Sequence, residues 1–312
     1  MPAQVANELE HSGFACFAGR PNAGKSTLAN ALVGQKVAIM SSKPQTTRHV
    51  VKGIVNRDDS QLVVIDTPGL HRPRTLLGER LNDLVYATWS EVDVIGVCLP
   101  ANEKIGPGDT YLINEVAKLP KVPQLVALAT KCDLVSPQRM VEHLVQIQAL
   151  EEEAGIRWDE IIPVSALTGE QVDVVADELI KLLPAGPRFY PAGEITDEPQ
   201  EAMVAELIRE AALEIVHDEL PHSIAVAIEE MRPRGGRPAE RPLTDIFASL
   251  IVERESQKGI IIGHRGERLK EIGSDARRQI AELLGTPVYL DLHVKVVKEW
   301  QRDAKALNRL GF

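Results

Sequence analysis

The sequence predicts an α/β fold, in which helices cover both faces of a mainly parallel sheet, followed by a smaller α+β domain. Apolar segments of strand length alternate with helical patterns over residues 14–183, as in parallel sheets with crossover helices. Residues 183–200 then carry four prolines and two glycines, which is the composition of a linker. Beyond it the patterns follow the order helix, strand, strand, helix, helix, strand. We therefore expect a first domain at residues 1–185, a linker at 186–200 and a second domain at 201–312.

Charge and cysteine content narrow the class of protein. The 312 residues carry a net charge of −10, which argues against a protein that coats nucleic acid nonspecifically. Residues 250–312, however, carry 12 Lys and Arg against 9 Asp and Glu, which indicates a localised polyanion contact. The sequence contains no signal-peptide pattern and no apolar run of about 18 residues. Cys16, Cys98 and Cys132 lack metal-ligand spacing, and the first two lie in apolar runs, so we expect reduced thiols in a cytosolic protein.

A glycine-rich segment separates the first strand pattern from the first helical pattern. It fits the G-x-x-x-x-G-K-[ST] pattern of phosphate-binding loops, and the strand and helix beside it are the required context. Gly19 and Gly24 allow backbone N–H groups to surround a phosphate, Lys25 can reach the β- and γ-phosphates, and the Ser26 hydroxyl can bind Mg²⁺. The predicted nucleotide-binding residues here are Gly19, Arg20, Pro21, Asn22, Ala23, Gly24, Lys25, Ser26 and Thr27.

A second part of the phosphate site follows a predicted antiparallel hairpin at residues 50–55 and 62–65. The hairpin ends in Asp66-Thr67-Pro68-Gly69. A carboxylate that closes a buried strand after a phosphate-binding loop is the usual second anchor for Mg²⁺. Gly69 leaves a backbone N–H free to approach a γ-phosphate. All four residues are therefore predicted to contact the nucleotide or its metal.

Two later strand patterns deliver polar residues at their carboxyl ends, Lys131-Cys132-Asp133 after residues 124–130 and Ser165-Ala166-Leu167 after residues 161–164. In order and position these segments resemble the base-recognition motifs N/T-K-x-D and S-A of guanine-nucleotide-binding proteins. A carboxylate at Asp133 can accept from both N1–H and the exocyclic amine of guanine, a pair of donors that adenine lacks. The predicted base-site residues are Thr130, Lys131, Asp133, Ser165, Ala166 and Leu167.

Thr130 stands where asparagine is the commoner residue of that motif. Without the amide, we expect a weaker link between the base loop and the phosphate loop. The consequence would be looser GDP binding with guanine selectivity retained.

The second domain carries a Gly-His-Arg-Gly loop between two helical patterns, and a Pro/Gly/Arg-rich loop at 232–241 between its first two strands. The element order resembles a type II KH domain, in which a G-x-x-G loop clamps about four nucleotides of RNA. A plain turn between helices is the alternative for a bare G-x-x-G, but the Ile-Ile-Ile-Gly lead-in and the basic cluster favour RNA binding. The predicted RNA-binding residues are Lys258, Ile262, Gly263, His264, Arg265, Gly266, Arg268 and Lys270.

These motifs, the segment Pro44-Gln45-Thr46-Thr47-Arg48 and the C-terminal KH pattern together resemble the Era family of bacterial GTPases over nearly the whole chain. The resemblance implies a GTP-hydrolysing switch that binds the 3′ end of small-subunit ribosomal RNA and acts in assembly and maturation of the 30S subunit. In that family the GTP state favours RNA binding. The resemblance also implies that Mg²⁺ is held by Ser26, Asp66 and Thr47, with Thr46 as the less favoured alternative. The residues assigned to catalysis are Asn22, Lys25, Thr47 and Gly69.

Hydrolysis itself is expected to be slow. Leu70 stands where Ras-like proteins place a water-orienting glutamine, and its side chain cannot align a water molecule. Asn22 resembles an asparagine that binds K⁺ in related GTPases, which predicts K⁺-stimulated hydrolysis with the ion in the role of an arginine finger. Arg20 lies inside the phosphate loop, so we expect it to be exposed on the surface and not to act as such a finger.

Two other functions compete with a GTPase switch. One is an RNA-binding assembly factor that holds a nucleotide structurally. The other is a P-loop phosphotransferase for a small metabolite, which lacks an acceptor site and leaves the second domain unexplained. We further expect a monomer in the cytoplasm, and the resemblance adds peripheral association with the inner face of the cell membrane, although no amphipathic anchor is obvious.

Overall fold

The structure, a computed structural model, describes residues 11–41, 43, 46–216, 223–238 and 240–312. The described chain forms two compact units. Unit 1 comprises the described residues up to Ala38, Thr47–Arg72 and Leu81–Asp197, and unit 2 comprises Ile39–Thr46, Pro73–Arg80 and Glu198–Phe312. Two short early segments therefore belong to the second unit, although the sequence prediction assigned them to the first domain.

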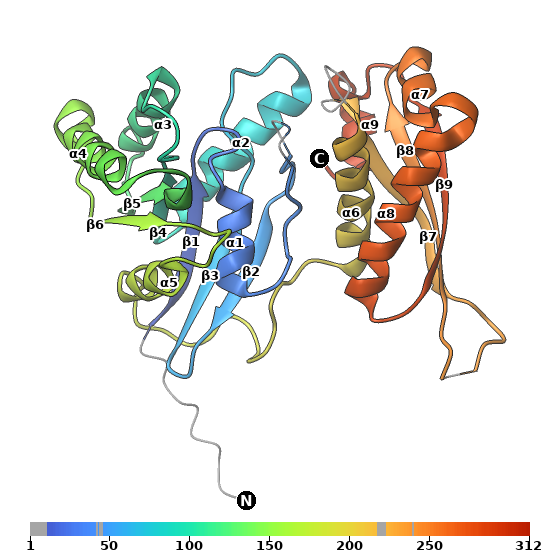
Figure 1. Cartoon of the computed structure of the whole chain (residues 1–312), viewed down its shortest axis with the longest axis horizontal. Coiled ribbons are helices and arrows are strands. Elements are labelled where there is room, and N and C mark those ends of the chain that lie inside the picture. Colours follow the sequence, from blue (N-terminus) through green and yellow to red (C-terminus); the bar gives the residue numbers. More distant parts are fainter. Residues whose placement is uncertain (1–10, 42, 44–45, 217–222, 239) are drawn as a thin grey trace, which may run out of the picture. The chain divides into compact units, whose positions relative to one another are not determined.

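Unit 1 is built on a six-stranded sheet in the order β2-β3-β1-β4-β5-β6 (Figure 1). All neighbouring strands are parallel except β2, which runs antiparallel to β3, so the predicted hairpin and the mainly parallel sheet are confirmed. The strands are β1 (His11–Ala18), β2 (Val51–Asn56), β3 (Ser60–Asp66), β4 (Val94–Cys98), β5 (Gln124–Thr130) and β6 (Glu160–Val164).

Helices cover both faces of this sheet, as predicted. One buried cluster joins α1 and α5 to one face, and a second joins α2, α3 and α4 to the other. Ser136 caps α4, where its Oγ accepts a hydrogen bond from the Arg139 N–H at 3.3 Å. The helices are α1 (Lys25–Val33), α2 (Leu76–Glu91), α3 (Pro107–Ala117), α4 (Pro137–Ala154) and α5 (Val172–Lys181), with a 3₁₀ turn, η1, at Cys132–Leu134.

The segment with linker composition is attached to unit 1 over much of its length. The Ile54 N–H of β2 donates to the carbonyl of Ile195 at 2.8 Å. Gln61 of β3 is fully buried, and its Oε1 accepts from the N–H groups of Phe189 and Tyr190 at 2.9 and 3.0 Å. Residues up to Asp197 therefore belong to this unit, because a buried amide on β3 holds a segment that composition alone describes as a linker.

Unit 2 contains a three-stranded sheet in the order β7-β8-β9, with β8 antiparallel to β7 and parallel to β9. The order α6-β7-β8-α7-α8-β9 is the one that the sequence predicted for a type II KH domain. The strands are β7 (Ala225–Pro233), β8 (Thr244–Val252) and β9 (Val288–Val296). The helices are α6 (Gln200–Ile215), α7 (Glu255–Ile262), α8 (Glu267–Leu284) and α9 (Ala304–Arg309), with 3₁₀ turns η3 (His264–Gly266) and η4 (Trp300–Arg302).

Two element boundaries in unit 2 differ from the prediction. The helical pattern in the sequence extends over residues 201–219, whereas helix α6 ends at Ile215, and residues 217–222 lie outside the described residues. Strand β7 begins at Ala225 and runs to Pro233, because the pairing with β8 continues past a bulge near Ile228 to the pair Pro233–Thr244. The proline-rich loop is correspondingly shorter.

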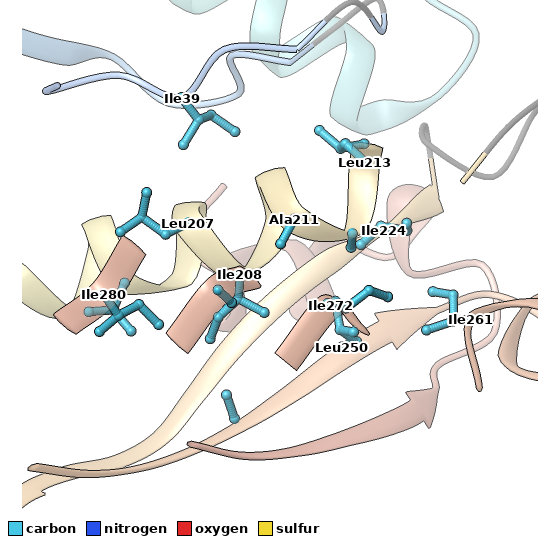
Figure 2. Packing of buried hydrophobic residues seen from close by; sticks show 14 of the residues in the cluster. Ile39, Leu207, Ile208, Ala211, Leu213, Ile224, Leu250, Ile261, Ile272 and Ile280 are labelled. Atoms are coloured by element: carbon cyan, nitrogen blue, oxygen red, sulfur yellow. The ribbon is translucent and has the colours of Figure 1, made fainter. Parts of the chain in front are cut away.

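The core of unit 2 lies between the sheet and the helices α6 and α8 (Figure 2). Ile208 of α6, Ile280 of α8 and Leu250 of β8 are fully buried in it. Ile39, from the early segment assigned to this unit, belongs to the same cluster and is 4% exposed. In the described part of the chain, every helix is too short or too polar to cross a membrane.

Candidate nucleotide and nucleic-acid sites

The glycine-rich loop of unit 1 connects the end of β1 at Ala18 to the start of α1 at Lys25. Two of its residues adopt left-handed backbone conformations, Asn22 with φ 63° and Gly24 with φ 93°. Glycine takes this conformation without a steric penalty, and asparagine tolerates it better than most residues. The sequence of the loop thus matches the backbone turn that brings its N–H groups to the start of a helix.

Lys25 holds its ammonium group inside the loop. Its Nζ donates to the carbonyl oxygens of Gly19 at 2.9 Å and Arg20 at 3.0 Å, and the residue is only 8% exposed. Burial lowers the pKa of Lys25, and the nearby Asp66 carboxylate partly opposes that shift. A buried cation that the protein only partly neutralises favours a bound anion, as a phosphate site requires.

Two hydroxyls and one carboxylate meet beside Lys25. Ser26 Oγ donates to Asp66 Oδ2 at 2.6 Å, Thr47 Oγ1 donates to the same oxygen at 3.1 Å, and the two hydroxyls lie 3.1 Å apart. Burial raises the pKa of Asp66 despite these hydrogen bonds. The second oxygen, Asp66 Oδ1, is buried without a hydrogen-bond partner among the described residues. An unpaired carboxylate oxygen beside two hydroxyls fits a hard cation such as Mg²⁺.

Thr46 makes different hydrogen bonds from Thr47. Its Oγ1 donates to the carbonyl of Lys43 at 2.7 Å, and its own carbonyl accepts a hydrogen bond from Arg209 of α6, within unit 2. Of the two threonines that the sequence left as alternatives, Thr47 is therefore the one that lies against Ser26 and Asp66.

Arg20 is held by two acidic residues and is not freely exposed. Its Nε donates to Asp109 Oδ1 at 2.7 Å and its Nη2 to Glu103 Oε2 at 3.0 Å, with 31% of the side chain exposed. Asp109 is 2% exposed and also accepts from the Gly106 N–H at the start of α3. The expectation that Arg20 is exposed on the surface is therefore wrong in part: about a third of the side chain is exposed, but its guanidinium connects the phosphate loop to α3. Nothing in the local sequence of Arg20 indicates these partners, which lie more than 80 residues away.

Thr130 connects the base loop to the phosphate loop, although the sequence led us to expect only a weak connection there. Its Oγ1 donates to the carbonyl of Ala23 in the phosphate loop at 2.7 Å, and both residues are buried. The hydroxyl reaches this carbonyl because β5 ends directly beside the loop. The reason for expecting looser GDP binding is thus removed, although the affinity itself stays a prediction.

The remaining base-site residues lie at the ends of two neighbouring strands. Thr130 pairs with Val164, so Lys131 and Ser165 follow directly at the same edge of the sheet. Ser165 is fully buried, and its Oγ accepts from the Thr168 N–H at 3.2 Å, which orders the loop that carries Ala166. Asp133 and Leu167 are exposed, the latter at 83%, and Lys131 Nζ lies 4.0 Å from Glu103 Oε1. Glu103 is thus shared by Arg20 and Lys131, which the sequence did not reveal.

The D-T-P-G segment follows β3 and stays close to the phosphate loop. Thr67 Oγ1 donates to the Phe17 carbonyl at 3.3 Å, and a Cβ on Gly69 would lie 3.6 Å from Lys25 Nζ. Thr67 and Pro68 are buried. Leu70 packs against the core between the sheet and helices α2 to α4, so its side chain cannot orient a water molecule.

In unit 2 the Gly-His-Arg-Gly loop joins α7 to α8. Gly263 and Gly266 have φ values of 71° and 82°, and a Cβ on Gly263 would lie 2.8 Å from Arg268 Cγ. His264 and Arg265 are exposed, whereas Arg268 turns back and donates from Nη1 to the Ile260 carbonyl at 3.0 Å. Arg268 therefore stabilises the end of α7 as well as adding charge. Lys258 and Ile262 are partly exposed on α7, and Lys270 is exposed on α8.

Both units match family models. A model described as a 50S ribosome-binding GTPase matches residues 14–131, and a KH domain model matches residues 219–301.

Several relatives are similar over nearly the full length. A GTPase Era of Streptomyces coelicolor is 64% identical over 309 residues, which cover 99% of this chain and 97% of that protein. A GTPase Era of Mycobacterium tuberculosis is 59% identical over 303 residues, covering 97% and 99% of the two chains.

Two solved structures are also similar, each at 36% identity and a TM-score of 0.90. One is a single-residue variant of Aquifex aeolicus Era bound to GDP and AlF₄⁻, and the match covers 96% of this chain and 99% of that one. The other is Era in complex with MgGDPNP and nucleotides 1506–1542 of 16S ribosomal RNA, with 96% and 98% covered.

Proposed function

The chain belongs to the Era family of GTPases, and from that premise we propose that unit 1 uses GTP hydrolysis to control the binding of small-subunit ribosomal RNA by the KH domain of unit 2. The process it serves is assembly and maturation of the 30S subunit. The observation that carries the proposal is the cluster of Ser26, Thr47 and Asp66 beside Lys25, where a metal-bound triphosphate can be sensed.

We assign the phosphates to the loop of residues 19–27. Its backbone N–H groups and the start of α1 receive the phosphate oxygens, and Lys25 exchanges its two carbonyl partners for the β- and γ-phosphates. Ser26, Thr47 and Asp66 would hold Mg²⁺, which neutralises charge on the phosphates. The unpaired Asp66 Oδ1 supports this assignment, as does the MgGDPNP bound by a relative with 36% identity.

Guanine selection is assigned to the loops after β5 and β6. The exposed Asp133 carboxylate would accept from N1–H and the exocyclic amine of the base, and the stem of Lys131 would lie along its plane. The Ala166 N–H, in a loop ordered by Ser165, would donate to the guanine carbonyl. Thr130 contributes by fixing this edge of the site to the phosphate loop.

For hydrolysis, Asn22 is assigned to a K⁺ ion, and Gly69 to the γ-phosphate through its N–H. Leu70 packs into the core, which supports a slow intrinsic rate. Arg20 is occupied by Asp109 and Glu103, so the positive charge needed in the transition state has to come from another source. A bound K⁺ ion would meet that need.

For RNA, the Gly263–Gly266 loop is assigned to the backbone of about four nucleotides. At Gly266 the space that a Cβ would occupy is open, and His264 and Arg265 are exposed beside it. Support comes from the related structure that contains a 16S ribosomal RNA segment. Contact with the 30S subunit, a monomeric state, a cytoplasmic location and peripheral membrane association stay predictions from the sequence.

The connection between nucleotide and RNA is assigned to the segment Ile39–Thr46, which directly precedes Thr47 in the chain. Within unit 2, Ile39 is buried in the core, the Met40 N–H donates to Glu210 Oε1 at 2.8 Å, and the Thr46 carbonyl accepts from Arg209. Thr47 is assigned to Mg²⁺, and loss of the γ-phosphate would free its side chain. The change would be passed through one peptide bond to Thr46, whose carbonyl accepts from Arg209 within unit 2.

Calorimetry on the full chain with Mg²⁺ tests the nucleotide assignment. We expect GTP and GDP to bind and ATP to give no binding heat. Asp133→Asn should shift the preference toward xanthine nucleotides, whereas Asp83→Asn, which alters an exposed carboxylate on α2, should leave it unchanged. Adenosine nucleotides that bind as tightly as guanosine nucleotides would contradict the proposal.

A further inference from the structure

The loop between β7 and β8 is rich in arginine. Residues 232–241 read Arg-Pro-Arg-Gly-Gly-Arg-Pro-Ala-Glu-Arg, with four arginines against one glutamate. We call its described residues, 232–238, 240 and 241, the arginine arm. It has no part in the nucleotide site or in the Gly263–Gly266 loop.

Two of its arginines are committed to neighbours within unit 2. Arg232 pairs with Glu230 at 2.8 Å, and Arg234 pairs with Asp245 at 2.6 Å. The other two, Arg237 and Arg241, are exposed, and no acidic side chain among the described residues pairs with either. Unpaired guanidinium groups on a chain of net charge −10 are suited to an anionic partner.

The arm projects from one end of the sheet. The ladder between β7 and β8 ends at Pro233 and Thr244, one more hydrogen bond joins the Arg234 N–H to the Leu243 carbonyl at 2.8 Å, and Gly236 turns the chain with φ 74°. Strand β8 starts at this end and leads to α7 and the Gly263–Gly266 loop at the other, as Figure 1 shows. Nine residues of strand separate the two ends by about 30 Å.

An exposed aromatic ring lies at the base of the arm. In β8 and β9 the residues Ile246, Ala248, Val288 and Leu290 face the helices, so Phe247 and Tyr289 alternate to the open face of the sheet. Their rings pack edge to face at 6.4 Å, and the Arg234 guanidinium lies over the Tyr289 ring at 5.0 Å. Tyr289 nevertheless remains 45% exposed. Ring and guanidinium planes are the surfaces on which unpaired bases stack.

We propose that the arginine arm, with Tyr289 at its base, is a second RNA-contacting surface of this chain. It binds the backbone of the same RNA at the end of β8 opposite to the one that leads to α7 and the G-x-x-G loop. Arg237 and Arg241 contact phosphates, and Tyr289 offers a stacking surface. An acidic protein segment could pair with Arg237 and Arg241, but it has no bases to stack on Tyr289. RNA can use both features and is therefore the favoured partner. The inference rests on the proposed RNA-binding function of unit 2.

Contact with the arginine arm raises the affinity of the chain for RNA without recognising particular bases. A strand held by the G-x-x-G loop keeps its flanking nucleotides at high local concentration near the arm, so even weak phosphate contacts add to binding. Each such contact releases counterions, and the slope of log K against log salt changes by about 0.7–0.9 for each phosphate. A short strand that fills only the G-x-x-G loop cannot gain from the arm.

The test compares two RNAs on the full-length chain. One is the segment equivalent to nucleotides 1506–1542 of 16S ribosomal RNA, and the other is a strand of about six nucleotides, just longer than a KH loop clamps. For Arg237→Gln/Arg241→Gln we expect about 10-fold weaker binding of the long RNA near 0.1 M salt and a salt slope reduced by about 1.5. Binding of the short strand should stay within about twofold. The matched control, Lys121→Gln/Arg157→Gln, removes the same charge from exposed positions in unit 1 and should change neither RNA.

Thermal unfolding of each variant shows whether a loss of RNA affinity is caused by misfolding. Because Arg237 and Arg241 are exposed, their replacement should leave the unfolding temperature unaltered. An unchanged affinity and salt slope for the long RNA would overturn the proposal, as would equal losses on both RNAs. The variant could instead bind both RNAs as tightly as the wild type does but lose the binding of polyglutamate that the wild type shows. The arm would then be a surface for an acidic protein. Failure of the wild type to bind either RNA would overturn the proposed function and the arm with it.

Discussion

Thr130 at the end of β5 donates its hydroxyl hydrogen bond to the carbonyl of Ala23 in the phosphate loop, at 2.7 Å. The threonine is 4% exposed and the alanine 1%, so this bond lies out of water. It joins the part of the site assigned to the base with the part assigned to the phosphates. The hydroxyl of Thr130 therefore supplies the link that the sequence comparison led us to expect only from an asparagine amide.

Removing that hydroxyl should loosen the nucleotide. Thr130→Val keeps the shape but leaves the buried Ala23 carbonyl unpaired, at a cost of about 1–3 kcal/mol. We expect GDP to dissociate roughly 10-fold faster, measured with a fluorescent GDP analogue. Thr130→Asn, which restores a donor, should stay within about threefold of the wild type. Equal rates for Thr130→Val and the wild type would show that the bond does not support nucleotide binding.

Arg20 should prove to be a structural residue of the loop. Because Asp109 and Glu103 occupy its guanidinium, Arg20→Ala should change kcat for GTP hydrolysis by less than about threefold, whereas an arginine finger is worth roughly 10³–10⁵. The same variant should lower the free energy of unfolding by about 1–3 kcal/mol, since buried Asp109 loses its charged partner and keeps only the bond from the Gly106 N–H. Arg157→Ala, at an exposed position between α4 and β6, is the control for stability. A drop of about a thousandfold in kcat would identify Arg20 as the finger.

Hydrolysis should depend on the monovalent cation. If a K⁺ ion at Asn22 supplies the positive charge, the rate in K⁺ buffer should exceed that in Na⁺ buffer by at least about tenfold, still below the effect of an arginine finger. Asn22→Ala should bring the two rates together. Equal rates for the wild type in both buffers would remove K⁺ from the account.

His143 should make unit 1 sensitive to mild acid. It is fully buried on α4, Nε2 lies 3.1 Å from the Leu99 carbonyl, and Nδ1 has no partner among the described residues. Burial is the main cause that lowers its pKa; the Leu99 carbonyl and Asp109 oppose the shift, and Arg139 adds to it.

A lowered pKa in the folded state fixes the sign of this effect. Above about pH 6.5, the ordinary value for histidine, the residue is neutral in both states and contributes no pH dependence. Below it the unfolded chain takes up the proton first, so the free energy of unfolding should fall by up to about 1.4 kcal/mol per pH unit until the folded pKa is reached. Urea unfolding at several pH values measures this. His143→Gln should lose the slope and His264→Gln, at an exposed position, should keep it; an unchanged slope in His143→Gln would refute the assignment.

The sequence was most informative where a residue's chemistry depends on its neighbours in the chain. Lys25 and Asp66 were identified because a loop motif and a strand end each predict a local geometry, and the parallel sheet then brings strand ends to one edge. Arg20 was misjudged because its partners are distant in the sequence: Asp109 lies on α3 and Glu103 in the turn before it. Gln61 was missed for the same reason, since only tertiary structure shows that a polar strand residue binds the backbone of residues 189 and 190.

Thr130 illustrates a different limit. Comparing residue types suggested a lost interaction, whereas the position of β5 beside the phosphate loop lets the threonine hydroxyl reach the Ala23 carbonyl. The sequence also did not reveal the two early segments that belong to unit 2. Nothing in the composition of residues 39–46 or 73–80 indicates that their contacts belong to unit 2.

The third phosphate of the bound nucleotide should control RNA binding by unit 2. The most direct measurement is the affinity of the full chain for the long RNA with Mg²⁺ and either a non-hydrolysable GTP analogue or GDP. We expect tighter binding with the GTP analogue by about 5–150-fold, the usual range of coupling between two sites. The difference should vanish in Lys25→Ala and persist in the exposed-site control Lys121→Ala. Equal RNA affinities with the two nucleotides in the wild type would contradict the account.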